Sequence, residues 1–302
     1  MAVITTGLHP KAVWPGVKVW FGRAYDEYQP QYTDLVDVET SDKAYEEEVE
    51  STGFGLASVK AQGASIAYDS DSQGYTKRYT NVTYGIGYMV TEEELEDNLY
   101  EEVSKRRAPD LAFALRQTKE NVVANLFNRG FNSSYLGGDA IEFFSTAHPT
   151  KFGNQSNHLT TAADMSEASI EDMVTQIRKA KNARGMNIRL MPKTLHIPTD
   201  LEFEAHRILN SVLQNDTAMN AVNVLKSTGA IPGGIKVNQY FTDTDAWYMR
   251  TNVRHGLKLY QRRGVKIQKD NDFDTSNAKV KATERYIPGW SDWRAAWGSP
   301  GA

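Results

Sequence analysis

The first ninety residues constrain the fold most, because they lack a pattern from which a compact hydrophobic core could form. Pro10, Pro15 and Pro30 punctuate residues 1–50, and the stretch 13–21 is expected to be extended. Residues 51–90 are rich in Gly, Ser, Thr and Tyr. We expect such a segment to become stable by lying on another surface, either its own domain or a neighbouring copy of the chain.

Two strands are predicted in this segment from the alternation of side chains. One contains Tyr75, Lys77 and Tyr79, and the other covers residues 82–88. The polar run 69–74 is a turn signal. Together these features predict a long β-hairpin, which would be marginally stable alone in water.

A long helical stretch follows, from Thr91 to Gly130. Thr91 and Glu94 have the spacing of a capping box, and apolar residues recur at intervals of three and four beyond residue 110. Pro109 is expected to break or kink the helix, and Gly130 to close it. The stretch covers about 38 residues, or roughly 57 Å if straight, which is typical of a structural strut and unusual in an enzyme domain.

The second half of the chain alternates shorter elements. An amphipathic helix is predicted over 169–184, with Ile170, Met173, Val174 and Ile177 on its apolar face and Gly185 after it. A short apolar strand over 194–197 and a helix over 201–213 follow. Strands are predicted over 235–241, 246–250, 257–260, 265–268 and 278–286. The pattern is that of an α+β protein.

Opposite charges concentrate in different parts of the sequence. Acidic residues dominate 26–50, whereas eleven basic residues lie between Arg250 and Arg294. A solvated face accounts for either run. Alternatively, the acidic segment pairs with the basic region within one chain or between copies, which would set the register of subunits. Under that hypothesis, reversing Arg262 and Arg263 to Glu changes assembly and its salt dependence.

Composition excludes several classes of protein. The chain has 302 residues, 40% hydrophobic and 24% charged, and no cysteine, so disulfides and thiolate metal sites are absent. No apolar run reaches the roughly 20 residues of a membrane helix, and residues 1–10 do not have the pattern of a signal peptide. The net charge of −4 argues against tight nucleic-acid binding, although a mildly acidic wall can enclose DNA.

No constellation of residues supports catalysis, so the sequence predicts no enzyme, no cofactor and no catalytic, cofactor-binding or metal site. GxGxxG, GxxxxGK[ST], GxSxG and HExxH are all missing. His196 lies in an apolar strand and is expected to be a core residue. His148 and His158 share a polar loop that has Asp139 and Asp164 near it in sequence, which leaves a metal site there as the alternative.

Four segments carry a resemblance to a known family. They are Ser41–Val49, Tyr84–Thr91, Thr194–Leu201 and Thr283–Arg294. With the order of the predicted parts, they resemble the major capsid proteins of tailed bacteriophages, including the shorter, Mu-like head subunits. The resemblance implies the Hong Kong 97 fold and a self-assembling shell of hexamers and pentamers around double-stranded DNA, bound without sequence specificity.

The same resemblance implies a division of the chain. Residues 1–45 would form an N-terminal arm, 46–90 the extended loop, 91–193 a peripheral domain with the spine helix, 194–255 the axial domain, and 256–302 strands that return to both domains. A separate scaffold protein, a portal and a decoration protein would be partners, with assembly in the host cytoplasm and a place in the virion. Some relatives cross-link a loop lysine to a neighbour's asparagine. Lys60 and Lys77 lie on the loop, but no matching Asn or Glu is identified, so that chemistry is not carried over.

Two structural alternatives stay open at this stage. An encapsulin-type compartment shares the fold and would hold protein cargo in place of DNA. Another phage structural protein, from a tail or baseplate, would form tubes or plates in place of closed shells.

Overall fold

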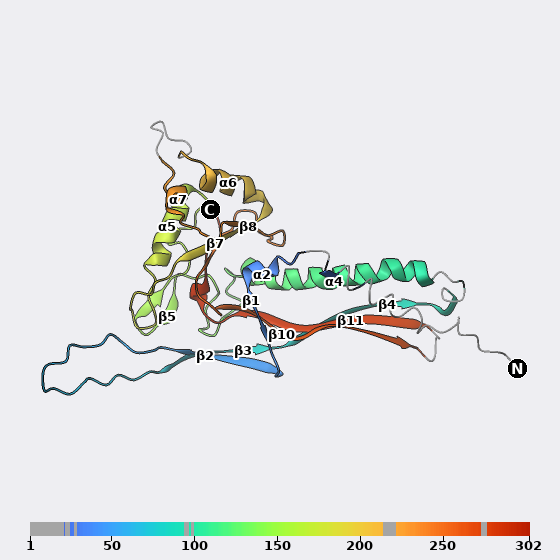
Figure 1. Cartoon of the computed structure of the whole chain (residues 1–302), viewed down its shortest axis with the longest axis horizontal. Helices are drawn as coiled ribbons and strands as arrows, with labels where there is room; N and C mark the ends of the chain where they lie inside the picture. Colours follow the sequence, from blue (N-terminus) through green and yellow to red (C-terminus); the bar gives the residue numbers. More distant parts are fainter. Residues whose placement is uncertain are drawn as a thin grey trace.

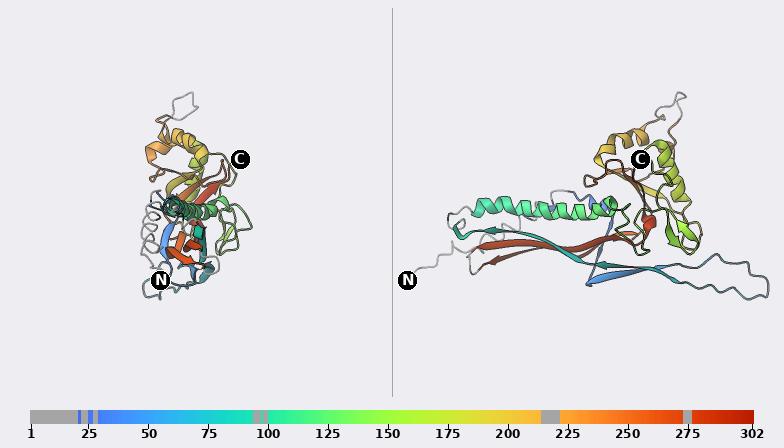
Figure 2. Two further views of the ribbon diagram at one scale, coloured as in Figure 1. Left: turned by 90° about the vertical axis from the view of Figure 1, so that its right-hand side faces the viewer. Right: turned by 180° about the vertical axis from the view of Figure 1, so that it is seen from behind.

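The computed structural model describes residues 21, 25–26, 29–93, 97, 100–213, 222–272 and 277–302. Figure 1 shows an L-shaped molecule. A long helix on a sheet forms the horizontal bar, a smaller lobe stands upright on one end of it, and a narrow hairpin projects past that end (Figures 1 and 2).

The bar is built on a four-stranded spine sheet. Its order is β1 (Asp37–Thr40), β10 (Leu257–Asn271), β11 (Ala278–Trp290) and β4 (Val82–Val90). β1 runs parallel to β10, and the other pairs are antiparallel. β10 combines two strands that the sequence predicted separately over 257–260 and 265–268, since only register irregularities between residues 261 and 266 interrupt its pairing.

Helix α4 (Tyr100–Asn128) lies along one face of this sheet. Its 29 residues span about 44 Å at about 1.5 Å per residue. Ala108, Leu111 and Leu115 pack with Val280 and Ala282 in one buried cluster. Pro109 was predicted to break or kink the helix, and the predicted break is wrong, because α4 continues through Pro109. The apolar packing on both sides of Pro109 outweighs one missing backbone hydrogen bond. Glu94, the partner in the predicted capping box, lies outside the described residues.

The end of α4 shows why Gly130 is required. The helix ends at Asn128, and the Gly130 N–H donates to the Phe127 carbonyl oxygen at 2.9 Å. A Cβ at this position would lie 2.4 Å from Cδ2 of Phe144. Close packing against an aromatic ring therefore restricts the position to glycine.

The upright lobe contains a second sheet, in the order β12 (Ala296–Ser299), β9 (Trp247–Thr251), β7 (Pro192–Ile197) and β8 (Ile235–Val237). Three helices surround this sheet: α5 (Glu167–Arg178), α6 (Glu202–Asn210) and α7 (Val224–Thr228). Three short helices lie in connections of the chain: α2 (Tyr32–Leu35), η3 (Thr199–Leu201) and η4 (Trp293–Ala295). The predicted apolar face of α5 is confirmed, as Ile170, Met173, Val174 and Ile177 are all buried.

Ser166 accepts a hydrogen bond from the Ser169 N–H and so caps α5 three residues before the predicted start. The predicted extension of this helix to residue 184 is wrong, because α5 ends at Arg178. The next residues form turns, in which the Ala180 N–H donates to the Ile177 carbonyl oxygen and Gly185 adopts a φ of +81°. His196, on β7, is buried, as predicted. Burial and the nearby charges of Arg250, Lys236 and Lys193 lower its pKa to about 3.

The hairpin consists of β2 (Tyr45–Ser51) and β3 (Gln73–Thr80), joined by residues 52–72 in an extended conformation. The predicted pairing of the strand at 75–79 with that at 82–88 is therefore wrong. β3 pairs with the acidic β2, whereas β4 leaves the hairpin at Asn81 and pairs with β11. The strand β2 was not predicted from its acidic sequence, because two of its glutamates, Glu48 and Glu50, pair with cations more than two hundred residues later, Lys258 and Arg294.

Candidate functional site

The root of the hairpin, Tyr45–Ser51 with Gln73–Thr80, is attached to the body by charge. Exposure alternates along β2, so Glu46, Glu48 and Glu50 face inward and the residues between them face outward. Glu48 accepts hydrogen bonds from Lys258 and Tyr260 of β10. Although burial acts to raise the pKa of Glu48, these bonds keep it below its ordinary value.

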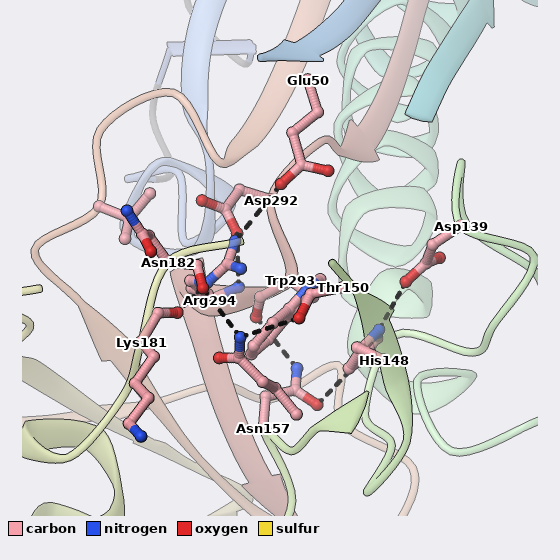
Figure 3. Close-up of polar contacts among 12 residues, drawn as sticks. Glu50, Asp139, His148, Thr150, Asn157, Lys181, Asn182, Asp292, Trp293 and Arg294 are labelled. Carbon is pink, nitrogen blue, oxygen red and sulfur yellow. Dashed lines mark hydrogen bonds and ion pairs between the residues drawn. The ribbon is translucent and has the colours of Figure 1, made fainter. Parts of the chain in front are cut away.

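Glu50 belongs to a second ionic group, drawn in Figure 3. Its carboxylate lies 3.7 Å from Nη1 of Arg294, which also contacts Asp292 at 3.2 Å. Arg294 Nε donates to the Lys181 carbonyl oxygen, so the group joins the hairpin to the lobe. Burial raises the pKa of Glu50 against the effect of Arg294, and Asp292 and Asp139 raise it further.

The predicted pairing of acidic and basic segments is confirmed within one chain. Besides the contacts of Glu48 and Glu50, Asp37 lies 2.7 Å from Arg250, and Asp42 lies 3.6 Å from Arg262. Arg263, the other residue named in the hypothesis, donates to Thr283 Oγ1. Whether such pairs also form between copies stays a prediction.

Tyr79 anchors the hairpin through its ring. The side chain is 2% exposed, its hydroxyl lies 2.5 Å from Ser291 Oγ, and its ring packs on Tyr260 with centroids 5.3 Å apart. A Cβ at Gly289 would lie 2.2 Å from the Tyr79 ring, so glycine makes room for it. One aromatic side chain thus fixes the hairpin root to β11.

Beyond the root, two aspartates hold the limbs of the extended loop, which we define as residues 52–72. Asp71 accepts from the Ser51 hydroxyl at 2.6 Å and from the Gly53 N–H at 2.8 Å. Asp69 accepts from the Gly55 N–H at 2.7 Å. These side-chain bonds connect the limbs where the β-ladder has ended.

The same part of the loop is tied to the body by Arg184 and its neighbours. Arg184 Nη1 contacts both carboxylate oxygens of Asp69, at 2.9 and 3.1 Å, and Nη2 donates to the Ser70 carbonyl oxygen. The Tyr75 hydroxyl donates to the Pro149 carbonyl oxygen at 2.5 Å, and Lys151 donates to Ser72. The loop therefore leaves the body in a defined direction.

The outer part of the loop exposes large apolar side chains. The exposed fraction is 100% for Val59, 89% for Tyr68 and 85% for Leu56, with Phe54 and Ile66 also exposed. Lys60 is exposed near the tip. Lys77, in contrast, donates to the Leu136 carbonyl oxygen at 2.8 Å, and burial lowers its pKa.

The structure brings together only two of the four residues considered for a metal site. His148 and Asp139 lie together, with Nδ1 and Oδ2 2.6 Å apart, and the imidazole stacks on Trp293 (Figure 3). His148 Nε2 contacts Asn157 Oδ1 at 3.1 Å. His158 instead contacts the Leu159 carbonyl oxygen, and Asp164 accepts from the Ala302 N–H. His148 thus belongs to a packed polar network that includes Asn157, which also donates to the Trp293 and Ala296 carbonyl oxygens.

Over the described ranges, no three His, Asp or Glu side chains gather in a way that could hold a metal ion. Among the helices described, none combines the length and apolar character needed to cross a membrane.

No pattern in the sequence indicated the contact of Arg184 with Asp69. These residues are 115 positions apart, and Arg184 was predicted only as the last residue of a helix before Gly185. The signal that could have pointed to the loop root is the pair Asp69 and Asp71 among Ser and Gly, a composition that favours side-chain bonds to backbone N–H groups.

Comparison with known proteins decides the family. A profile described as "Phage capsid protein" matches residues 74–298, which is more than half of the chain. The chain belongs to the phage capsid protein family. No curated protein matches it.

Solved structures of phages and of a virus-like particle share the fold. The structure described as "Mycobacterium phage Patience" aligns over 99% of this phage capsid protein and 90% of its own chain, with 12% identity and a TM-score of 0.54. "Mycobacterium phage Che8" gives 15% identity, 91% and 93% coverage and a TM-score of 0.51. "Crystal structure of virus-like particle from Pyrococcus furiosus" gives 11% identity, 94% and 97% coverage and a TM-score of 0.50. The predicted Hong Kong 97 fold is confirmed, and the phage capsid protein is a shell subunit.

Proposed function

We propose that this chain is the major capsid protein that assembles as hexamers and pentamers into an icosahedral shell around phage double-stranded DNA. The observation that carries the proposal is the extended loop. It exposes Leu56, Val59 and Tyr68 at more than four fifths of their surface each, in a segment that has no core of its own. Several large apolar side chains exposed on one short segment are typical of a surface that binds a partner.

A second copy of the chain is the proposed partner. Burial of the loop's apolar side chains on a neighbour would contribute about 25 cal/mol per Å², and symmetry would repeat that contact at every subunit. A shell closed from rings of two sizes needs the same contact at two angles. A loop tied to the body at its root only, through Tyr79, Asp69 and Arg184, is suited to that demand.

The domain division stays part of this proposal. Residues 194–255, which supply β8, β9 and most of β7 in the upright lobe, would be the axial domain at the centre of each ring. Helix α5, assigned with residues 91–193 to the peripheral domain, packs on the same lobe. The spine sheet with α4 would be the peripheral domain, and residues 1–45 the arm. A separate scaffold protein, a portal and a decoration protein are proposed partners. We propose assembly in the host cytoplasm and a place in the virion.

The test replaces residues 56–67 by Asn-Gly, a two-residue connection that suits a hairpin. The contacts of Asp69, Asp71 and Tyr79 remain, so the variant is expected to fold with an unchanged thermal midpoint. It is expected to form no closed shells in negative-stain electron micrographs. Lys60→Gln, an exposed change in the same loop, is the matched control and is expected to form shells.

Normal shells from the shortened variant would contradict the proposal.

The contents of wild-type particles from infected or expressing cells separate a phage head from a protein compartment. Nuclease-protected DNA supports a phage head, whereas a protein cargo would support a compartment such as an encapsulin, the alternative that also shares this fold.

A further inference from the structure

A cleft of about 570 Å³ lies where the two sheets meet, away from the hairpin root. Strand β7 contributes Lys193, β9 contributes Arg250, β1 contributes Asp37, and the connection from β9 to β10 contributes Arg254 and His255. Its volume falls in the range of about 300–1,000 Å³ that is usual for ligand sites in proteins.

The charges that line the cleft do not balance. Lys193, Arg250 and Arg254 face a single carboxylate, that of Asp37. Asp37 is engaged by Arg250 Nη2 at 2.7 Å and by the His255 N–H at 3.3 Å. Two positive charges are therefore left in excess.

Lys193 and Arg254 supply that excess. Both side chains are exposed, and within the described part of the chain neither has a carboxylate within ion-pair distance. Lys236, a third cation nearby, is already paired with Asp34 at 3.3 Å.

The surrounding structure fixes the guanidinium group of Arg250 and the turn that carries Arg254. Arg250 is 6% exposed and donates from Nη1 to the Asp34 carbonyl oxygen at 3.0 Å, so its guanidinium is fixed. The turn that carries Arg254 is held by His255, whose ring lies 2.5 Å from Glu39 and whose φ is +58°. Such a backbone conformation is costly for a residue other than glycine, and it persists only where the surroundings impose it.

The same cations also act on two neighbouring groups. Burial is the main cause of the low pKa of His196 on β7, and the charges of Arg250, Lys236 and Lys193 lower this pKa further. Burial acts to raise the pKa of Asp37, but the hydrogen bond and charge of Arg250, together with Lys193, bring it below its ordinary value. Both effects agree with the excess of positive charge that the lining of the cleft shows.

We propose that this cleft binds a phosphate group. Phosphate monoesters carry between about 1.5 and 2 negative charges near neutral pH, which matches the two excess positive charges. Guanidinium groups suit the spacing of phosphate oxygens, and ammonium groups complement them as point charges. The phosphate is either free, as the inorganic ion or a small monoester, or part of a nucleic-acid backbone. The site does not depend on shell formation.

The test is a calorimetric titration of the full chain with inorganic phosphate at low ionic strength, where screening is weak. Saturable binding is expected, and the double variant Lys193→Gln/Arg254→Gln should bind at least tenfold more weakly. Lys266→Gln/Lys281→Gln is the matched control, because it removes the same charge from exposed positions of the spine sheet and should bind as wild type. The thermal midpoints of both variants show that they are folded.

A short DNA duplex then identifies the source of the phosphate. Displacement of bound phosphate by the duplex from wild type assigns the site to a nucleic-acid backbone, and failure to displace it assigns the site to a free phosphate or monoester. The proposal is overturned if wild type shows no saturable binding. It is equally overturned if the cleft variant binds as wild type, or if the control variant loses as much affinity as the cleft variant.

Discussion

Charged side chains are buried in the spine and exposed in the extended loop. Between α4 and the spine sheet, Lys119 of α4 and Glu284 of β11 pair at 2.5 Å with side chains only 2% and 1% exposed, and Gln261 donates a hydrogen bond to the same carboxylate. On the loop, Asp69 and Arg184 pair at 2.9 Å with 45% and 20% of their side chains exposed. The apolar side chains divide in the same way, since those under α4 are buried and those at the loop tip are not.

This difference indicates where each region gains its stability. In the spine, polar groups are paired and apolar side chains are buried within one chain, so its charges should contribute to the stability of the fold. In the extended loop only the residues at the root have such contacts, so its charges should set the direction of the loop and affect assembly. Lys119→Met, Glu120→Gln and Arg184→Gln test that division, and His196→Gln extends the test to the sheet of the upright lobe. The expected change in stability decreases from Lys119 through His196 and Glu120 to Arg184.

Lys119→Met should reduce the free energy of unfolding by about 3–5 kcal/mol, because it leaves the Glu284 carboxylate buried without its cation. Urea unfolding of the unassembled chain measures the change. The double variant Lys119→Met/Glu284→Met should recover most of the loss, since an apolar pair replaces the ionic one. A cost below about 1 kcal/mol for the single change would show that the spine does not depend on this buried pair.

The pH dependence of stability tests His196. Its pKa is about 3 in the folded chain and near the ordinary 6.5 when unfolded, so the unfolded chain binds an extra proton between these values. The free energy of unfolding should therefore fall as pH drops below 6.5, by up to about 1.4 kcal/mol per pH unit. His196→Gln should flatten this slope, measured between pH 7 and pH 5. The exposed His206→Gln, as control, should keep the slope of wild type.

Glu120→Gln should cost about 1 kcal/mol. This α4 carboxylate is 3% exposed and accepts from the Tyr32 N–H at 2.8 Å and the Gln31 N–H at 3.0 Å, so it caps helix α2. The amide keeps one acceptor oxygen but loses the charge. Hydrogen exchange of the Tyr32 amide, compared between variant and wild type, should become faster, and unchanged exchange would exclude this role.

Arg184→Gln should leave the thermal midpoint unchanged and alter assembly. The ion pair with Asp69 is solvent-exposed, where such pairs contribute little to folding, yet it fixes the direction of the loop. Electron micrographs should show fewer or irregular shells. Arg178→Gln, exposed at the end of α5 only 6 positions away, should assemble normally. Regular shells from Arg184→Gln would mean that the loop is directed by Tyr79 and the root alone.

The sequence predicted best what local periodicity controls. The buried face of α5 and the apolar strand that contains His196 follow from spacing alone. It failed at β2 (Tyr45–Ser51), where the inward-facing residues are Glu46, Glu48 and Glu50, of which the last two meet cations, and the residues between them are exposed. Hydrophobicity cannot detect such a strand, because its inward face is charged.

Contacts between residues far apart in the sequence were the second feature that could not be predicted. Nothing local to residues 82–90 specifies β11 as the partner of β4, and nothing near Asp69 specifies Arg184. The charge segregation between 26–50 and 250–294 did carry long-range information, because it predicted contacts such as Asp37 with Arg250. It could not assign individual partners within each segment.

The contacts of Arg184 make the outer part of the hairpin a short lever. Arg184 holds Asp69 and Ser70 to the body, and the chain turns back at Gly63, where the Ala64 N–H donates to the Ala61 carbonyl oxygen. The free arm between Asp69 and this turn covers about 6 steps of roughly 3.3 Å, or about 20 Å. A rotation of about 10° at the Arg184 contact would move the tip by about 3–4 Å, close to the length of one residue in a strand. Small changes of geometry at one guanidinium group would thus shift which residues of a neighbour the tip can reach.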